Sequence, residues 1–134
     1  MLLEINHHSG QPIYRQVIEQ IRRQIMAGQL CEGEQLISVR ELAAQLRVNP
    51  MTISKAYSLL EVEGLVERRR GVGLFVAELP KDQKGRTKAE LLEEALTKAV
   101  TTAVQFEIPE EEVKEMLDRL YQKYDSRLRS NSND

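Results

Sequence analysis

Two helix-start signals stand close together in the middle of the chain, and they leave room for only a short helix and a tight turn between them. Ser38-Val39-Arg40-Glu41 is a capping box, in which Ser and Glu satisfy backbone N–H groups at a helix start. Asn49 is a strong N-cap, and Pro50 is favourable at the first position of a following helix. Arg47-Val48 is then the turn. This spacing predicts a helix-turn-helix pair.

Three stretches of the first half place apolar side chains at helical spacing. The first opens at Pro12, ends at Gly28 and repeats an apolar residue at every fourth position. The second and third are the two helices of the pair, and the third ends at Gly64. The predicted buried faces are Ile13, Val17, Ile21 and Ile25, then Leu42, Ala43 and Leu46, then Ile53, Ala56, Tyr57 and Leu60.

Two short strand-like runs, 65–69 and 74–77, follow the third helix. Arg70-Gly71-Val72-Gly73 lies between them and supplies two glycines that are free to take positive φ. The runs therefore predict a β-hairpin with a basic tip. Helix, helix, turn, helix and hairpin is the order of a winged helix-turn-helix, so the predicted fold class is α+β but mostly α.

The second half predicts a two-helix tail. Residues 79–86 contain Pro80 and Gly85 among charges and are predicted to be a linker, after which Thr87-Lys88-Ala89-Glu90 is a second capping box. Pro109 precedes three glutamates, which suit the first turn of another helix. We expect a DNA-binding domain over 1–78, a dimerisation and effector tail over 87–129, and a disordered end over 130–134.

The tail helices carry more apolar surface than two helices can bury between themselves. Docking against the same helices of a second subunit would cover these stripes through a two-fold interface. The tail therefore predicts a homodimer. The residues predicted to form its interface are Leu92, Leu96, Ala99, Val100, Val104, Leu117, Leu120, Tyr121 and Tyr124.

Composition leaves some function classes open and argues against others. The chain has 134 residues and a net charge of −2, so local clusters must carry any attraction to nucleic acid. One cysteine, Cys31, excludes an internal disulfide and fits a reducing cytoplasm, and no apolar run approaches the ~20 residues of a membrane span. His7 and His8 lack further ligands at suitable spacing, so we expect neither metal nor cofactor. No catalytic set is suggested, and an enzyme is not expected.

The helix-turn-helix and the hairpin together predict a DNA-binding surface. The second helix of such a pair enters the major groove, where small or polar side chains reach base edges and nearby cations meet phosphates. Arginines of the hairpin suit the negative potential of a narrow minor groove. The predicted contacts are Ser38, Arg40, Asn49, Pro50, Met51, Thr52, Ser54, Lys55, Tyr57, Arg69, Arg70, Gly71 and Gly73; the Tyr57 ring is expected in the core, with its hydroxyl reaching a phosphate.

Six motifs over residues 11–77 occur at the spacing of a known family. They are Pro12-Ile13-Tyr14-x-Gln16, Gly28-x-Leu30-x-x-Gly33, Leu36-x-Ser38-x-Arg40-x-Leu42-Ala43, Val48-Asn49-Pro50-x-Thr52-Ile53-Ser54-Lys55-Ala56-Tyr57, Leu60-Glu61-x-x-Gly64 and Gly71-x-Gly73-x-Phe75-Val76. Together they resemble the GntR family of bacterial transcription regulators. The Asn-Pro start and the short tail are similar to its YtrA-type branch, which lacks a large effector domain.

The resemblance implies specific roles. Base reading would fall on Arg40, on Asn49, Pro50, Thr52 and Ser54 of the recognition helix, and on Arg70 and Gly71 at the wing tip. Several branches have arginines where this chain has Pro50 and Ser54, so no operator sequence carries over. The implied protein is a homodimeric repressor that binds a pseudo-palindromic operator of a neighbouring operon, such as transporter genes, and is relieved by an unidentified signal, with room for a small-molecule effector.

A second function class remains open at this point. A winged helix can also serve as a protein-interaction module, with the basic hairpin binding an acidic partner. Such a module would not distinguish a specific duplex from a random one across a salt titration.

Overall fold

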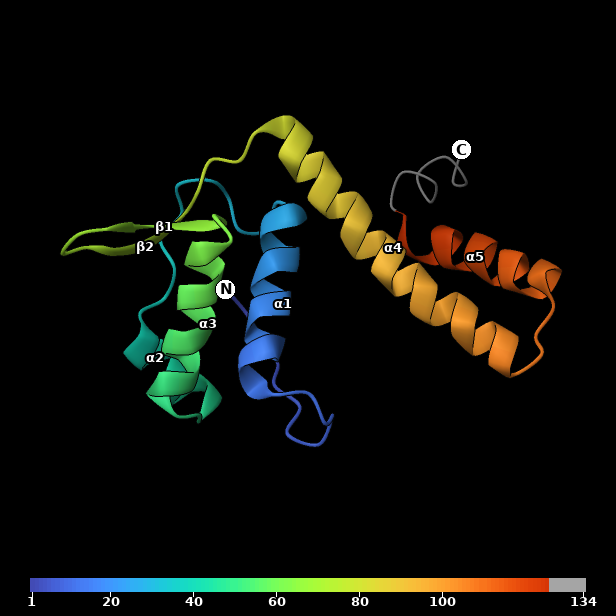
Figure 1. The fold of residues 1–134 in the computed structure, drawn as a ribbon, viewed down its shortest axis with the longest axis horizontal. Coiled ribbons are helices and arrows are strands. Elements are labelled where there is room, and N and C mark those ends of the chain that lie inside the picture. Colours follow the sequence, from blue (N-terminus) through green and yellow to red (C-terminus); the bar gives the residue numbers. More distant parts are fainter. Residues whose placement is uncertain (126–134) are drawn as a thin grey trace. The chain divides into compact units, whose positions relative to one another are not determined.

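The computed structural model describes residues 1–125, and Figure 1 shows its elements in chain order. The chain divides after Lys88 into two compact units. The mostly helical winged helix-turn-helix predicted from the sequence is confirmed. The elements are α1 (Ile13–Met26), α2 (Val39–Leu46), α3 (Pro50–Val62), β1 (Val66–Arg69), β2 (Gly73–Val76), α4 (Lys81–Gln105) and α5 (Glu110–Tyr124).

Both predicted helix starts are formed as the capping residues require. The Ser38 hydroxyl accepts a hydrogen bond from the Glu41 N–H at 3.1 Å, and the Asn49 side-chain oxygen accepts one from the Met51 N–H at 2.9 Å. Between them Arg47 takes the left-handed conformation with φ 56°. This residue ends α2 and reverses the chain into α3, so the helix-turn-helix is built by local signals alone.

The core of the first unit lies where α1 and α2 pack against α3. Helix α3 contacts both of the other helices, and β1 follows it onto the same core. Every predicted helix face is turned inward, although Ile13 and Leu46, at the ends of their helices, are only half-buried. The largest fully buried side chains are Ile21, Leu42, Ile53, Leu60, Val17 and Val66.

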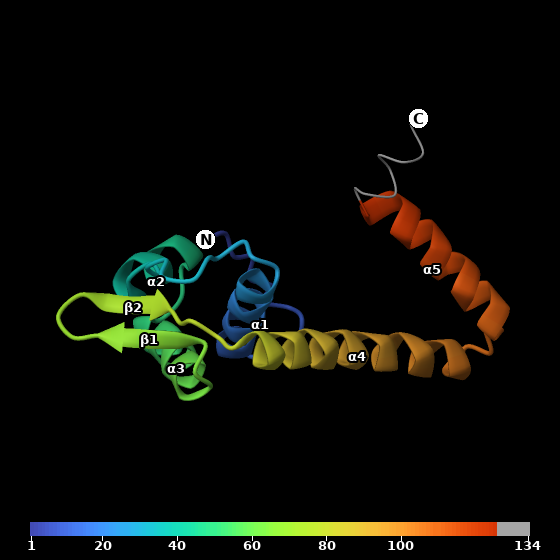
Figure 2. The ribbon, with the colours of Figure 1, turned by 90° about the horizontal axis from the view of Figure 1, so that it is seen from above.

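The hairpin is antiparallel, with Val66 opposite Val76 and Arg69 opposite Gly73 (Figure 2). Residues 33–36 pair with the free edge of β2. The Leu36 N–H donates to the Leu74 carbonyl at 2.8 Å, and the Val76 N–H donates to the Glu34 carbonyl at 2.8 Å. Both edges of β2 are therefore occupied, which anchors the hairpin to the helical core.

The predicted linker over 79–86 is wrong for residues 81–86, which form the first turns of α4. The Lys84 N–H donates to the Pro80 carbonyl at 2.9 Å, so Pro80 stands at the helix start, where proline costs no hydrogen bond. Gly85 is tolerated inside the helix at a cost of about 1 kcal/mol. Thr87 is no N-cap: its hydroxyl donates to the Gln83 carbonyl one turn earlier, at 3.0 Å.

Helix α5 begins directly after Pro109, as predicted, with Glu110, Glu111 and Glu112 in its first turn. Residues 126–129 of the expected tail and the expected disordered end, 130–134, lie outside the described residues. Among the described residues, no helix combines the length and the hydropathy needed to cross a membrane.

Three glutamines spaced one turn apart on α1 bind the backbone of the N-terminal segment. The Gln16 amide accepts from the Asn6 N–H at 2.8 Å and donates to the Asn6 carbonyl at 2.9 Å. Gln20 makes the same pair of bonds to Glu4, and Gln24 donates to the Leu2 carbonyl at 2.7 Å. Residues 2–6 are thus held along α1, which the sequence analysis did not anticipate.

Gln16 is the key side chain of this ladder, because it is 7% exposed and also lies within hydrogen-bond distance of the Ser9 hydroxyl and the Gln11 carbonyl. Gln16→Ala removes these part-buried hydrogen bonds together, and we expect it to lower the free energy of unfolding by about 1–3 kcal/mol. Urea denaturation measures the loss. Gln24→Ala removes a single exposed bond and should cost less than about 1 kcal/mol; equal losses would contradict the role assigned to Gln16.

Candidate nucleic-acid interface

The start of α3 presents most of the predicted reading residues to solvent. Asn49, Pro50 and Ser54 are exposed, Met51 is 77% exposed, and Thr52 is half-buried. The Asn49 oxygen is used as the N-cap, whereas its amide nitrogen makes no hydrogen bond within residues 1–125. The same end of the motif therefore offers donors at the positions where base edges would lie.

Helix α2 contributes one free cation to this surface. Arg40 is exposed in its first turn, and it forms no ion pair with any described residue. Ser38 is also exposed, but its hydroxyl oxygen already caps α2. Arg40 is thus free to reach a guanine edge or a phosphate, as predicted.

The side chain of Lys55, which lies on α3, is directed toward α1. Its ammonium nitrogen lies 4.0 Å from the centre of the Tyr14 ring on α1. This cation–π contact turns the charge toward α1, beside the exposed face that begins at Asn49. The charge of Lys55 thus lies on the α1 side of α3, and its contact with DNA stays a prediction.

Tyr57 is buried with 3% exposure, as its place on the inner face of α3 predicts. Its hydroxyl donates a hydrogen bond to the Ile37 carbonyl at 2.7 Å, and burial raises its pKa above the usual value. The hydroxyl proton is thus used to hold the segment before α2 against α3. We therefore withdraw the expected phosphate contact and give Tyr57 a supporting role.

The three arginines of the hairpin have different surroundings. Arg68 pairs with Glu61 of α3 at 3.2 Å. Arg69 lies over the Phe75 ring at 4.0 Å and pairs with Glu67 at 3.6 Å. Arg70, at the exposed tip, makes no ion pair within the part of the chain that the structure describes. Arg70 is thus the wing cation that is free to enter a minor groove.

Gly71 and Gly73 shape the tip of the wing. Both have positive φ, 76° and 142°, which side-chain-bearing residues rarely adopt. A Cβ at Gly73 would lie 2.9 Å from the Gln35 side-chain nitrogen, and that nitrogen donates to the Val72 carbonyl at 3.0 Å. Gln35, which the sequence analysis missed, therefore braces the wing from outside the hairpin.

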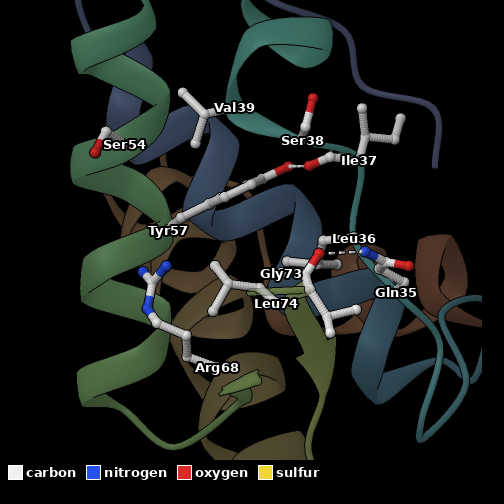
Figure 3. A pocket seen from close by; sticks show the side chains of 11 residues that line it. Gln35, Leu36, Ile37, Ser38, Val39, Ser54, Tyr57, Arg68, Gly73 and Leu74 are labelled. Atoms are coloured by element: carbon white, nitrogen blue, oxygen red, sulfur yellow. Dashed lines mark hydrogen bonds between the residues drawn. The ribbon is translucent and has the colours of Figure 1, made fainter. Parts of the chain in front are cut away.

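A cavity of about 270 Å³ lies between the start of α2, the outer face of α3 and β2 (Figure 3). Ser38 and Ser54 face it from the two helices, and the Tyr57 side chain spans it toward Ile37. Arg68 and Leu74 line the side toward the wing. The cavity thus lies between α3 and the wing.

The site consists of hydrogen-bond donors and positively charged side chains, which are groups suited to binding. Within residues 1–125, no group of three or more His, Cys, Asp or Glu side chains could hold a metal ion. The predicted contacts that are exposed at the starts of α2 and α3 are Ser38, Arg40, Asn49, Pro50, Met51 and Ser54, while Arg70 and Gly71 are exposed at the wing tip.

The chain is similar to known bacterial regulators. A family model described as "Bacterial regulatory proteins, gntR family" matches residues 13–76. The HTH-type transcriptional repressor YtrA of Bacillus subtilis is 37% identical over 102 residues, which is 76% of this chain and 78% of the repressor.

Two solved structures resemble most of the chain. A GntR family transcriptional regulator from Listeria monocytogenes has a TM-score of 0.72 and 29% identity, over 83% of this chain and 96% of the regulator. A protein described as a transcriptional antiterminator from Listeria monocytogenes EGD-e has a TM-score of 0.71 and 32% identity, over 92% of each chain.

Proposed function

Because the chain belongs to the GntR family of bacterial transcription regulators, we propose that it represses transcription by binding a pseudo-palindromic operator as a homodimer. The observation that carries the proposal is the exposed start of α3, with the unpaired Arg40 beside it and the unpaired Arg70 at the wing tip. These groups suit base edges in the major groove and a narrow minor groove next to it. The protein acts on DNA in the bacterial cytoplasm.

The tail supports the homodimer. Helices α4 and α5 diverge from their connection at 106–109 (Figure 2). Apolar side chains on both helices are exposed. Leu120 is 50% exposed, Tyr121 58% and Leu92 57%. Burial of such a side chain stabilises by about 1.5–3 kcal/mol, so covering several of them favours association strongly.

Two apolar grooves in the tail give a second copy a place to dock. One has a volume of about 440 Å³ and is lined by Leu92, Leu96, Leu117, Leu120, Tyr121, Tyr124 and Asp125. The other, of about 470 Å³, includes Ala99, Met116, Leu117 and Leu120. Of the predicted interface residues, Val100 and Val104 line neither groove but are 51% and 71% exposed. The same grooves are where a small effector would sit between subunits.

Dimerisation also supplies the mechanism of regulation. Two recognition helices about 34 Å apart would read two half-sites on one face of the duplex. A signal that favours a different arrangement of the subunits would lower operator affinity, because each arrangement binds DNA differently. The controlled operon would be a neighbouring one, such as transporter genes.

Selection of bound duplexes from a random pool tests the proposal and yields the operator. A conserved pair of inverted half-sites is the expected result. A pool that stays random, with equal binding of all duplexes across a salt titration, would instead favour a protein-interaction module. Repeating the selection with candidate metabolites identifies the signal.

Arg40→Ala should weaken binding to the selected operator by about 5- to 150-fold for each half-site and relax the preference at one base pair of each half-site, the loss typical of a base-reading arginine. Gel shifts at fixed salt measure the affinity. Arg23→Ala removes an exposed arginine from the last turn of α1 and serves as the control, with affinity within about twofold of the wild type. Unchanged binding by the Arg40 variant would remove Arg40 from the reading surface.

A further inference from the structure

A small cationic cluster lies where α1 meets α3, next to the reading surface. Lys55 of α3 places its ammonium nitrogen 4.0 Å from the centre of the Tyr14 ring. The Arg15 guanidinium, on the neighbouring residue, and after it the charge of Lys55, lower the pKa of the Tyr14 hydroxyl. Two positive charges thus meet at one tyrosine.

The groups around this cluster leave its charge largely uncompensated. The first turn of α1 contains no acidic residue. Glu19, one turn further along α1, attracts Arg15, but its carboxylate also accepts a hydrogen bond from the Gln11 amide at 3.0 Å. Arg15 and Lys55 are both exposed. The cluster is therefore an open site with an excess of positive charge.

Its hydrogen-bonding groups match a phosphodiester. Beside the Tyr14 ring, the Lys55 ammonium has three N–H donors and the Arg15 guanidinium has five, while the Tyr14 hydroxyl can donate its own proton. An ammonium, a guanidinium and a hydroxyl directed at one anion make charge-assisted hydrogen bonds. No part of this set selects one base over another.

The cluster also lies at the end of the first unit where α3 begins. Helices α1 and α3 pack against each other and begin at the same end (Figure 1). Lys55 follows Met51 by one helical turn, so it neighbours the exposed first turn of α3. A duplex with α3 in its major groove brings its sugar-phosphate backbone along the flank of that helix.

We propose that Tyr14, Arg15 and Lys55 form a binding site for one backbone phosphate of the duplex and set the depth and register of α3 in the major groove. The inference rests on the proposed DNA-binding function and extends the interface to α1. It also assigns Lys55 to positioning instead of base reading, since phosphate contacts orient a protein without carrying sequence information.

Salt titrations of the Arg15→Gln/Lys55→Gln double variant test this site on the selected operator and on a random duplex. In the proposed dimer each subunit loses one phosphate contact, so the slope of log affinity against log salt should fall by about 1.8 in total, which is about 60-fold in affinity near 0.1 M salt. Both duplexes should lose affinity by the same factor. Tyr14→Phe keeps the ring and removes the hydroxyl, and we expect a smaller loss that is again equal for both duplexes.

Arg23→Gln is the matched control, because it removes one exposed charge from the other end of α1 and should leave the slope at the wild-type value. A wild-type slope in the double variant would overturn the phosphate site. A changed base preference would overturn the assignment of Lys55 to positioning. Failure of the proposed function is distinct from both, since the wild-type protein would then bind the two duplexes equally.

Discussion

If the proposed homodimer forms through the tail grooves, Leu120→Asp is expected to convert it into monomers and to reduce affinity for an operator with two half-sites by about 100-fold or more. Leu120 lines both tail grooves and is 50% exposed in the single chain. A carboxylate there would be buried without a partner against the second subunit, which strongly opposes association. Once the subunits separate, the second half-site is no longer bound intramolecularly, and an advantage of about 10²–10⁴ is lost.

Sedimentation equilibrium measures the oligomeric state, and gel shifts with one and two half-sites measure binding. Gln122→Asp adds the same charge two residues away, on the opposite side of α5, and should remain dimeric. The Leu120 variant should bind a single half-site as the wild type does. A dimeric Leu120 variant, or equal dissociation by both variants, would exclude these grooves as the interface.

Leu60→Ala should lower the free energy of unfolding by about 2–5 kcal/mol, because it opens a cavity in the core that α3 shares with α1 and α2. Leu60 is fully buried, at 0% exposure. In a domain of this size the loss is a large part of the total stability, so operator binding should fall steeply as the temperature rises.

Leu59→Ala is the matched control, since the adjacent leucine is 37% exposed and its removal should cost about 1 kcal/mol or less. Urea denaturation with equal protein concentrations compares the two. Similar losses, or a larger loss for Leu59, would show that α3 is rotated relative to the orientation described above, and the reading surface would have to be reassigned with it.

The helix-turn-helix could be predicted because its signals act over a few residues. Ser38 and Asn49 each cap a helix through a backbone N–H two or three positions away, and Arg47 reverses the chain between them. Apolar spacing then identified the buried faces of α1 and α3. These features depend on contacts within one segment.

The prediction of a linker over 79–86 was wrong because proline and glycine occur both in linkers and in helices. Pro80 and Gly85 were interpreted as helix breakers, yet proline suits a helix start and one glycine costs little inside a long helix. Thr87 does not cap a helix, because it lies inside α4, where its hydroxyl donates to the Gln83 carbonyl one turn earlier. Whether such residues break or begin a helix depends on what the neighbouring turns do.

The sequence by itself determined the order of the elements, the capped start of α3 and the residue types offered to DNA. Only the tertiary structure decided how those side chains are used. In the folded chain Lys55 lies over the Tyr14 ring and Arg68 pairs with Glu61, whereas Arg70 at the wing tip makes no ion pair with a described residue. The tertiary structure also bound residues 2–6 to the glutamines of α1. Caps and periodicity are local, whereas the partner of a long polar side chain depends on which distant segment packs beside it.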